Sequence, residues 1–206
     1  MWNIKTWVIT LPCRVFLDAY RNQRIDFHPT DILTFGDYHP KHQKKYKEMD
    51  PFSIRILNIK KDGNDMPDEY HEDWMHDCRY FSNGLSSILS KKNELVICVM
   101  PSHTEGYSTS GVRMIAKLLL SANIIDGTEL LTRVYDIPEK SIGGLRDFNS
   151  EICSLSVNNS ELLLKQQVLL LDDITTTGTS LWAGKEILLN AGAELVAMYA
   201  LGKTVH

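Results

Sequence analysis

After residue 92, the sequence alternates short apolar runs with segments in which apolar residues recur at helical spacing. The runs are short and rich in branched side chains, as in strands buried on both faces of a sheet: LVICVM (95–100), QVLLLDD (167–173) and ELVAMYAL (194–201). Helices are expected after Ser108 to Ser110 and over Thr179 to Ala191. This alternation predicts an α/β domain with a largely parallel sheet, in which ligands bind beyond the carboxyl ends of the strands.

Further elements are expected around this core. LLTRVY (130–135) and EICSLSV (151–157) have strand patterns, and DIPEKSIGGLRDFNS (136–150) is predicted to be a mobile loop. In the first half, TWVITL (6–11) and SIRILNI (53–59) resemble strands or the apolar stripe of a short helix, and YFSNGLSSIL (80–89) resembles a helix. We therefore expect an N-terminal extension or hood over residues 1–92 and a core domain over residues 93–206.

Two charged stretches of the first half are predicted to be solvated loops, namely PKHQKKYK (40–47) and KDGNDMPDEYHED (61–73). HEDWMH (71–76) resembles a zinc-protease motif, but its histidines are five residues apart, whereas HExxH requires four. We interpret it as an acidic surface loop. The basic stretch offers Tyr46 for stacking on nucleic acid, although a solvated charge run is the favoured interpretation.

Composition narrows the classes of function. The 206 residues suit one domain, with or without an extension, and 43% apolar with 23% charged residues is typical of soluble globular proteins. A formal charge of -4 disfavours a protein whose main partner is a nucleic-acid backbone. The four cysteines are scattered without CxxC spacing, which indicates neither zinc nor a disulfide framework and favours the reducing cytoplasm. No apolar run approaches the roughly 20 residues that span a bilayer, so no membrane partner is expected.

The segment VLLLDDITTTGTS (168–180) carries the chemistry. Its apolar strand ends at Asp172 and Asp173, which period-two geometry points to opposite sides of the sheet, so at least one faces the crevice. A carboxylate pair matches the two hydroxyl donors of a vicinal diol such as that of ribose. No metal is needed directly on the aspartates for that pairing.

The residues that follow have the composition of a phosphate loop. Thr175, Thr176, Thr177, Gly178, Thr179 and Ser180 lie where a turn becomes a helix, so that backbone N–H groups, hydroxyls and the positive end of the helix dipole converge there. The segment is not a Walker A loop, because no lysine follows a GxxxxG frame. Diol-binding carboxylates beside a phosphate loop suggest a ribose 5-phosphate group.

This segment resembles the phosphoribosyl pyrophosphate (PRPP) motif of type I phosphoribosyltransferases. Over residues 94–206 the chain is also similar to the ComF-like branch of that family, in the segments VICVMPSH, GVRMIAKLL, LTRVYDIPEKSIGGLRDFN, LLLDDITTTGTS and NAGAELVAMYALGKT. Upstream, FSIRILNIKKDG is similar to the segment that ends in a lysine before the family's core. The N-terminal zinc-binding cysteines of many ComF-like proteins are absent, and Lys140 stands about where a glutamine is common.

The resemblance implies transfer of a ribosyl group from C1 of PRPP, with pyrophosphate leaving and Mg²⁺ bridging ribose and pyrophosphate. It implies that Asp172 and Asp173 hold the ribose hydroxyls, and that Ile174 and the residues through Ser180 form the phosphate loop. Pro101, Ser102 and His103 would form the pyrophosphate loop, and Lys140 or Arg146 in the 136–150 loop would counter the pyrophosphate charge. For His103, Lys140 and Arg146, an ordinary role as loop side chains stays open.

Three classes of function remain open at this stage. The first is an enzyme with a nucleobase-like acceptor, whose hood is expected from residues 1–92 because only a strand and a short tail follow the last predicted helix. The second is a regulator that senses PRPP or a nucleotide and passes the signal to a second copy or a protein partner. The third, suggested by the ComF-like resemblance, is an accessory in handling single-stranded DNA.

Overall fold

The computed structural model describes residues 32–40, 49–61, 67–89, 94–104, 110–137 and 147–205. Its elements in chain order are β1 (Ile32–Tyr38), α1 (Pro51–Ile59), α2 (Asp68–Ile88), β2 (Leu95–Val99), α3 (Gly111–Leu118), β3 (Ile124–Gly127), β4 (Leu131–Arg133), α4 (Phe148–Cys153), β5 (Leu155–Val157), η4 (Ser160–Leu163), β6 (Gln167–Thr175), α5 (Thr179–Asn190) and β7 (Leu195–Thr204). Among these described helices, none is long and apolar enough to cross a membrane.

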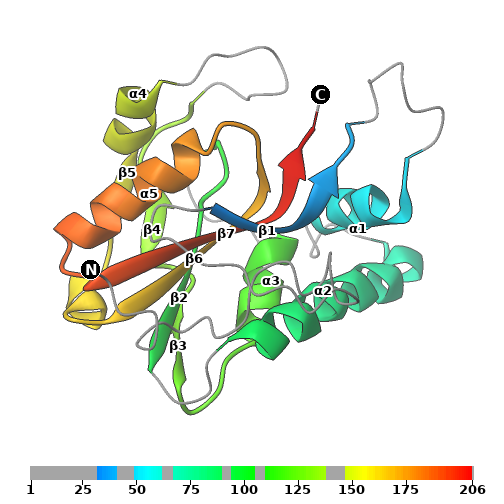
Figure 1. The fold of residues 1–206 in the computed structure, drawn as a ribbon, viewed down its shortest axis with the longest axis horizontal. Helices are drawn as coiled ribbons and strands as arrows, with labels where there is room; N and C mark the ends of the chain where they lie inside the picture. Colours follow the sequence, from blue (N-terminus) through cyan, green and yellow to red (C-terminus); the bar gives the residue numbers. More distant parts are fainter. Residues whose placement is uncertain are drawn as a thin grey trace, which may run out of the picture.

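Five strands form the central sheet in the order β1-β7-β6-β2-β3, and every neighbouring pair is parallel (Figure 1). The α/β class with a parallel central sheet is therefore confirmed. From β2 the chain moves outward to β3, whereas from β6 it moves in the opposite direction to β7. The strand order thus reverses between β2 and β6, and a crevice at such a reversal is where open α/β sheets bind ligands.

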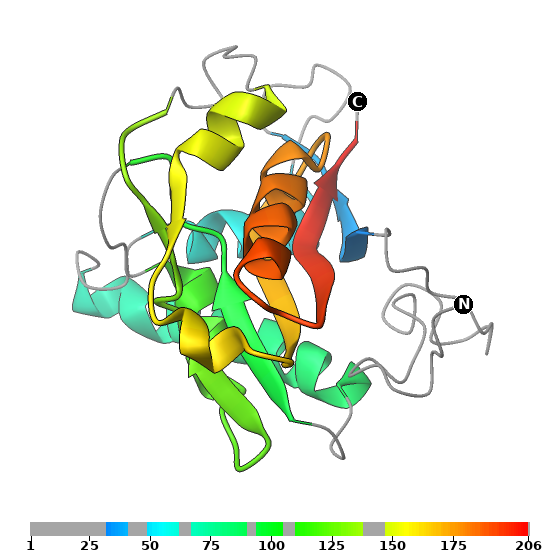
Figure 2. The same cartoon turned by 90° about the vertical axis from the view of Figure 1, so that its left-hand side faces the viewer.

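Alternate residues of the central strands face two separate cores. Leu169 and Leu171 of β6 pack in the cluster that includes α1, α2 and α3, whereas Val168 and Leu170 pack in the cluster that includes α5. Figures 1 and 2 show these helices on opposite sides of the sheet. All four side chains are fully buried, and each such burial contributes about 1.5–3 kcal/mol. The continuous apolar run of β6 is thus explained by helices on both faces.

The elements before residue 92 are packed against the same sheet. β1 pairs with β7 along its length, and Phe35 of β1 lies 5.1 Å, centroid to centroid, from Tyr199 of β7 and 5.6 Å from Phe81 of α2. The division into two domains at residue 92 stays a prediction. TWVITL and residues 41–47 lie outside the described residues.

Helix α1 resolves the ambiguity of SIRILNI, which is helical. Asp50 caps it by accepting a hydrogen bond from the backbone N–H of Ser53 at 2.9 Å, and Pro51 occupies the first turn, where a missing N–H costs nothing. The buried side chains Ile56 and Ile59 point to the sheet.

Helix α2 corrects the prediction of a solvated loop over residues 61–73. The helix begins at Asp68, so HEDWMH is helical, and the predicted helix at 80–89 is the second half of α2. Its buried apolar side chains recur at intervals of three and four residues: Trp74, Cys78, Phe81, Leu85 and Ile88. The acidic residues of the first turn suit the positive end of the helix dipole.

Two other predictions need correction. EICSLSV is not one strand, because residues up to Cys153 belong to α4 and only Leu155–Val157 form β5. Asp147 begins α4 by accepting from the backbone N–H of Ser150 at 2.7 Å. The strand predicted at 130–135 is the short β4, which pairs with β5 in a small antiparallel sheet. The sheet strands β1 and β3 were not predicted.

Candidate functional site

The acidic pair lies near the carboxyl end of β6, next to the point where the strand order reverses. Asp172 continues the row of residues on the α5 side of the sheet, and Asp173 continues the row on the α1 side, as the period of two requires. Both side chains are partly exposed. Each carboxylate accepts a hydrogen bond from the next backbone amide: Asp173 N to Asp172 Oδ1 at 2.9 Å, and Ile174 N to Asp173 Oδ1 at 2.5 Å. The two acids are thereby held in fixed orientations at the carboxyl ends of the parallel strands.

Lys60, which follows α1, reaches this pair from the helix layer. Its Nζ lies 3.2 Å from Asp173 Oδ2, and the two side chains are 43% and 28% exposed. Burial lowers the pKa of Lys60, but the carboxylate of Asp173, together with Asp172 and Tyr38, raises it by more, so that the net pKa lies above its usual value. The edge therefore presents a firmly charged cation next to its carboxylates, where a phosphorylated ligand would meet both.

The predicted phosphate loop is shorter in the structure than in the sequence motif: Ile174 and Thr175 belong to β6, Thr176 to Gly178 form the connection, and Thr179 and Ser180 begin α5. Thr176 Oγ1 donates to Thr204 Oγ1 at 3.0 Å, and the hydroxyls of Thr177 and Thr179 share a hydrogen bond of 2.8 Å. Gly178 adopts φ 82° as the residue before α5, a conformation that disfavours a side chain. Gly178 is the N-cap residue of α5 and has no side chain that could cap it, and the N–H of Thr179 lies 3.5 Å from Thr177 Oγ1.

The loop after β2 lies next to that of β6. Met100 N donates to Leu171 O at 2.8 Å, which extends the pairing of the two strands up to Pro101. Ser102 Oγ and Thr104 Oγ1 are 2.8 Å apart, and the carbonyl oxygen of His103 accepts from Ile137 N at 2.9 Å. The predicted pyrophosphate loop, Pro101 to His103, therefore follows the strand next to the one that carries the acidic pair.

A buried ion pair lies between these two loops. Arg133 of β4 and Glu151 of α4 are 1% and 0% exposed, and Nη1 of Arg133 lies 3.0 Å from Oε2 of Glu151. Arg133 Nε donates to the carbonyl oxygen of Ser102 at 3.0 Å. Ser180 Oγ donates to Glu151 Oε1 at 2.6 Å. The predicted phosphate-loop residue Ser180 thus turns its hydroxyl into the protein.

Lys140 and Arg146 lie outside the described residues, so their role stays a prediction. Among the described residues, no group of three or more His, Cys, Asp or Glu side chains is arranged to hold a metal ion. The carboxylate oxygens of Asp172 and Asp173 are nevertheless ligands of the kind that Mg²⁺ prefers, because proteins commonly hold this ion through one or two carboxylates and the phosphates of a substrate.

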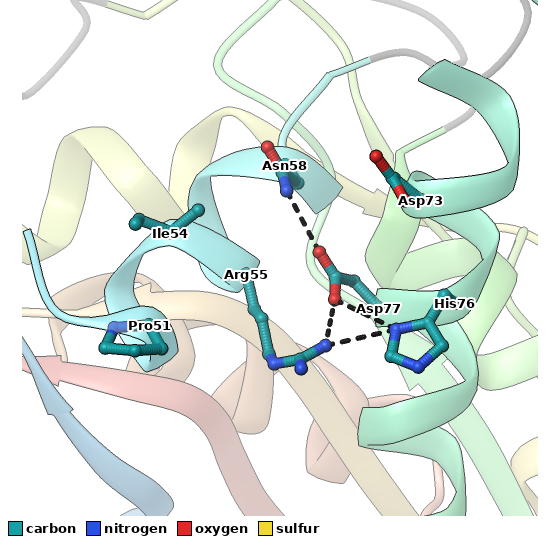
Figure 3. Close-up of a pocket in the computed structure, with 7 residues that line it drawn as sticks. All are labelled: Pro51, Ile54, Arg55, Asn58, Asp73, His76 and Asp77. Carbon is teal, nitrogen blue, oxygen red and sulfur yellow. Dashed lines mark hydrogen bonds and ion pairs between the residues drawn. The ribbon is translucent and has the colours of Figure 1, made fainter. Parts of the chain in front are cut away.

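A separate hollow of about 400 Å³ lies between α1 and α2 (Figure 3). Arg55, His76 and Asp77 point toward one another there, and Asn58 Nδ2 donates to Asp77 Oδ2 at 3.0 Å. The carboxylate of Asp77, which is 5% exposed, is therefore well supplied with donors. We interpret the cluster as a polar contact that holds α1 on α2, and none of the predicted site residues lines the hollow.

Sequence reasoning assigned no role to Lys60, Arg133 or Glu151. Lys60 and Arg133 lie within segments quoted for the family resemblance, but spacing along the chain does not reveal the contacts of either. Glu151 was placed on a strand, and the signal that would have placed it on a helix was Asp147 three residues before Ser150, a spacing typical of an N-cap.

No protein-family model matches the sequence, and no curated protein matches it. Among solved structures, the chain is similar to a hypoxanthine phosphoribosyltransferase from Staphylococcus aureus, with 17% identity and a TM-score of 0.34, over 66% of this chain and 74% of that chain. A likeness of this size carries no argument about activity, and it lends no support to the ComF-like branch. The fold class rests on the order and direction of the strands.

Proposed function

We propose that this chain binds PRPP at the carboxyl edge of its sheet and transfers the 5-phosphoribosyl group to an acceptor. One observation carries the proposal: two partly exposed aspartates lie near the carboxyl end of β6, next to the reversal of strand order, and a hydroxyl-rich loop leads from the end of this strand into the N-terminus of α5. Carboxylates and a phosphate loop this close together suit one ligand that has both a diol and a phosphate.

In this proposal the carboxylates of Asp172 and Asp173 accept hydrogen bonds from the ribose hydroxyls. The 5′-phosphate lies against the hydroxyls and backbone N–H groups of Thr175 to Thr179. The pyrophosphate lies toward the loop of Pro101 to His103, across the crevice. Lys60 offsets part of the negative charge that the ligand brings to the acidic pair.

The reaction breaks the bond between C1 of the ribose and the pyrophosphate oxygen and forms a bond between C1 and the acceptor, which loses a proton. Positive charge develops on the ribose ring as pyrophosphate leaves, and fixed carboxylates next to the ring stabilise that charge. The chain therefore acts mainly by positioning the ligand. Mg²⁺, when bound with the pyrophosphate, would supply charge neutralisation of the leaving group, and the carboxylate oxygens of Asp172 and Asp173 suit it.

Calorimetric titration with PRPP in the presence of Mg²⁺ tests binding. We expect the wild type to bind, and the double substitution Asp172→Asn with Asp173→Asn to raise Kd at least a hundredfold, because hydrogen bonds to charged groups contribute about 1.5–3 kcal/mol each. Glu194→Gln is the matched control, since Glu194 is an exposed acid next to the amino ends of the strands, opposite to Asp172 and Asp173. Absence of binding heat at millimolar PRPP would refute the proposal.

Assays of pyrophosphate release separate transfer from sensing. A panel of nucleobases and related acceptors is offered to the wild type with Mg²⁺ and PRPP, and release above that of the double variant identifies an enzyme. Binding without release across the panel would favour the regulator class over the transferase.

A further inference from the structure

The ion pair of Arg133 and Glu151 stands out because both side chains are almost completely buried and both have partners in the loops of the site. Burial of two charges is costly, and it is tolerated only where further hydrogen bonds complete their surroundings. Here part of that completion comes from Ser102 on one side and Ser180 on the other.

The contacts form one continuous path from the loop after β2 to the first turn of α5. It runs from the carbonyl oxygen of Ser102 to Arg133 Nε at 3.0 Å, then from Arg133 Nη1 to Glu151 Oε2 at 3.0 Å, and then from Glu151 Oε1 to Ser180 Oγ at 2.6 Å. Ser154 supports the pair, because its hydroxyl contacts Arg133 Nη1. Since the guanidinium has a planar fork of donors, it meets Ser102 and Glu151 at the same time.

Movement of either loop away from this path would leave a buried charge short of a hydrogen bond. The penalty for an unsatisfied buried group exceeds the net gain of making the bond, so the pair resists such movement. It therefore sets the separation between the loop after β2 and the start of α5, which is the separation that the two phosphate-bearing ends of PRPP would have to match.

We propose that Arg133 and Glu151 are positioning residues that hold the two loops of the site at a fixed separation, and that Ser180 serves the site through Glu151 rather than by a hydroxyl contact to phosphate. The hydroxyl proton of Ser180 is donated to Glu151, and a phosphate oxygen needs donors. The effect on PRPP binding rests on the proposed function. The link between the two segments through Arg133 and Glu151 does not.

Hydrogen exchange tests the tie without any ligand. In Glu151→Ala both the contact to Arg133 and the contact to Ser180 are lost, so backbone exchange should rise at least fivefold in residues 102–104 and 179–182. Ser82→Ala is the matched control, because Ser82 is a buried serine of α2 outside this path. Exchange at wild-type rates in both segments of Glu151→Ala would overturn the proposal.

A double-variant cycle with PRPP and Mg²⁺ tests the role of Ser180. Ser180→Ala should raise Kd about fivefold in the wild type but less than twofold in the Glu151→Ala background, because the path is already broken there. Equal losses in the two backgrounds would overturn this role and favour a direct phosphate contact.

The variants keep both outcomes interpretable. If Glu151→Ala does not fold, Arg133→Lys takes its place, since lysine keeps the charge but lacks the second arm that meets Ser102. If the wild type binds no PRPP, the proposed function fails, and the exchange experiment alone then decides whether the pair joins the loops.

Discussion

Helix α5 carries a glycine with positive φ at each end, and this symmetry provides a sharp test of the phosphate loop. Gly178 precedes the helix with φ 82°, and Gly192 follows it with φ 107°. We predict that alanine at either position lowers stability to a similar extent, and that only Gly178→Ala weakens PRPP binding. The reason is that Gly178 adjoins the N–H groups proposed to hold the phosphate, whereas Gly192 lies at the opposite end of the helix.

The size of the stability loss follows from the backbone. A left-handed conformation costs an ordinary residue about 1–2 kcal/mol, and the less flexible unfolded chain of alanine returns about 0.4–1 kcal/mol. A methyl group at Gly178 would lie 2.4 Å from Ile32 Cδ1, and one at Gly192 would lie 2.9 Å from Leu164 Cδ2, so each neighbouring side-chain end must shift. We expect a net loss of about 1 kcal/mol in each variant, or about 2–4 °C in Tm.

The effect on binding is separate and larger. If the methyl group of Gly178→Ala displaces one hydrogen bond between an N–H and the phosphate, worth about 1.5–3 kcal/mol, Kd rises roughly ten- to hundredfold. Urea titration gives the stability of each variant, and calorimetry with PRPP and Mg²⁺ gives its Kd. The reasoning is refuted if the two variants bind PRPP equally well, or if Gly178→Ala is as stable as the wild type.

Three further outcomes are expected. Asp50→Ala should destabilise the fold by about 1 kcal/mol at pH 7 in urea titration, since it removes the cap of α1. Burial raises the pKa of Asp50, but hydrogen bonds from Ser53 and His39 lower it by more, so the difference from wild type should shrink as pH falls below about 4; a difference that persists in acid would contradict this. Lys60→Met should lower Tm slightly from pH 6 to 9. The difference in Tm from the wild type should disappear above about pH 10.4, because the raised pKa of Lys60 keeps the side chain charged up to that range. A difference that already narrows by pH 8 would count against the ion pair. Iodoacetamide at pH 8 should label exposed Cys153 long before buried Cys78, whose pKa burial and the charge of Asp77 raise to about 12, and peptide mass spectrometry reads the order.

The parts of the fold that the sequence predicted are those in which composition, spacing and flanking residues all indicate the same element. The run from Val168 to Leu171 is apolar at every position, as expected for a strand covered on both faces, and the strand continues past the two aspartates to Thr175. Helix α5 was predicted over residues 179–191 because glycine, hydroxyls and apolar spacing agree there, and the structure ends it at Asn190.

The missed elements are those in which composition and spacing disagree. The first turns of α2 are rich in acidic residues, which suggested a loop, whereas the signal lay in Trp74, Cys78 and Phe81, three apolar residues at helical spacing. β1 is held by pairing with β7, a contact that joins residues far apart in the sequence. No local window contains that information.

The residues of the candidate site also fall into a group that the sequence predicted and a group that it did not. Asp172, Asp173 and the loop through Ser180 are contiguous, so one motif names them together. Lys60 and Glu151 contact residues of this motif only after folding, and Arg133 is linked to it through Glu151. Contacts of that kind depend on tertiary packing, and no local sequence pattern predicts them.

The alternation along β6 has a consequence for how such a chain can change over time. Insertion or deletion of one residue between Val168 and Leu171 would send every later side chain of the strand to the other face. The same event would exchange the surroundings of Asp172 and Asp173, so that the acid now beside Lys60 would face the α5 side. The number of residues in this strand is therefore constrained twice, by the packing of its apolar side chains and by the positions of Asp172 and Asp173. A change of one residue would disturb both.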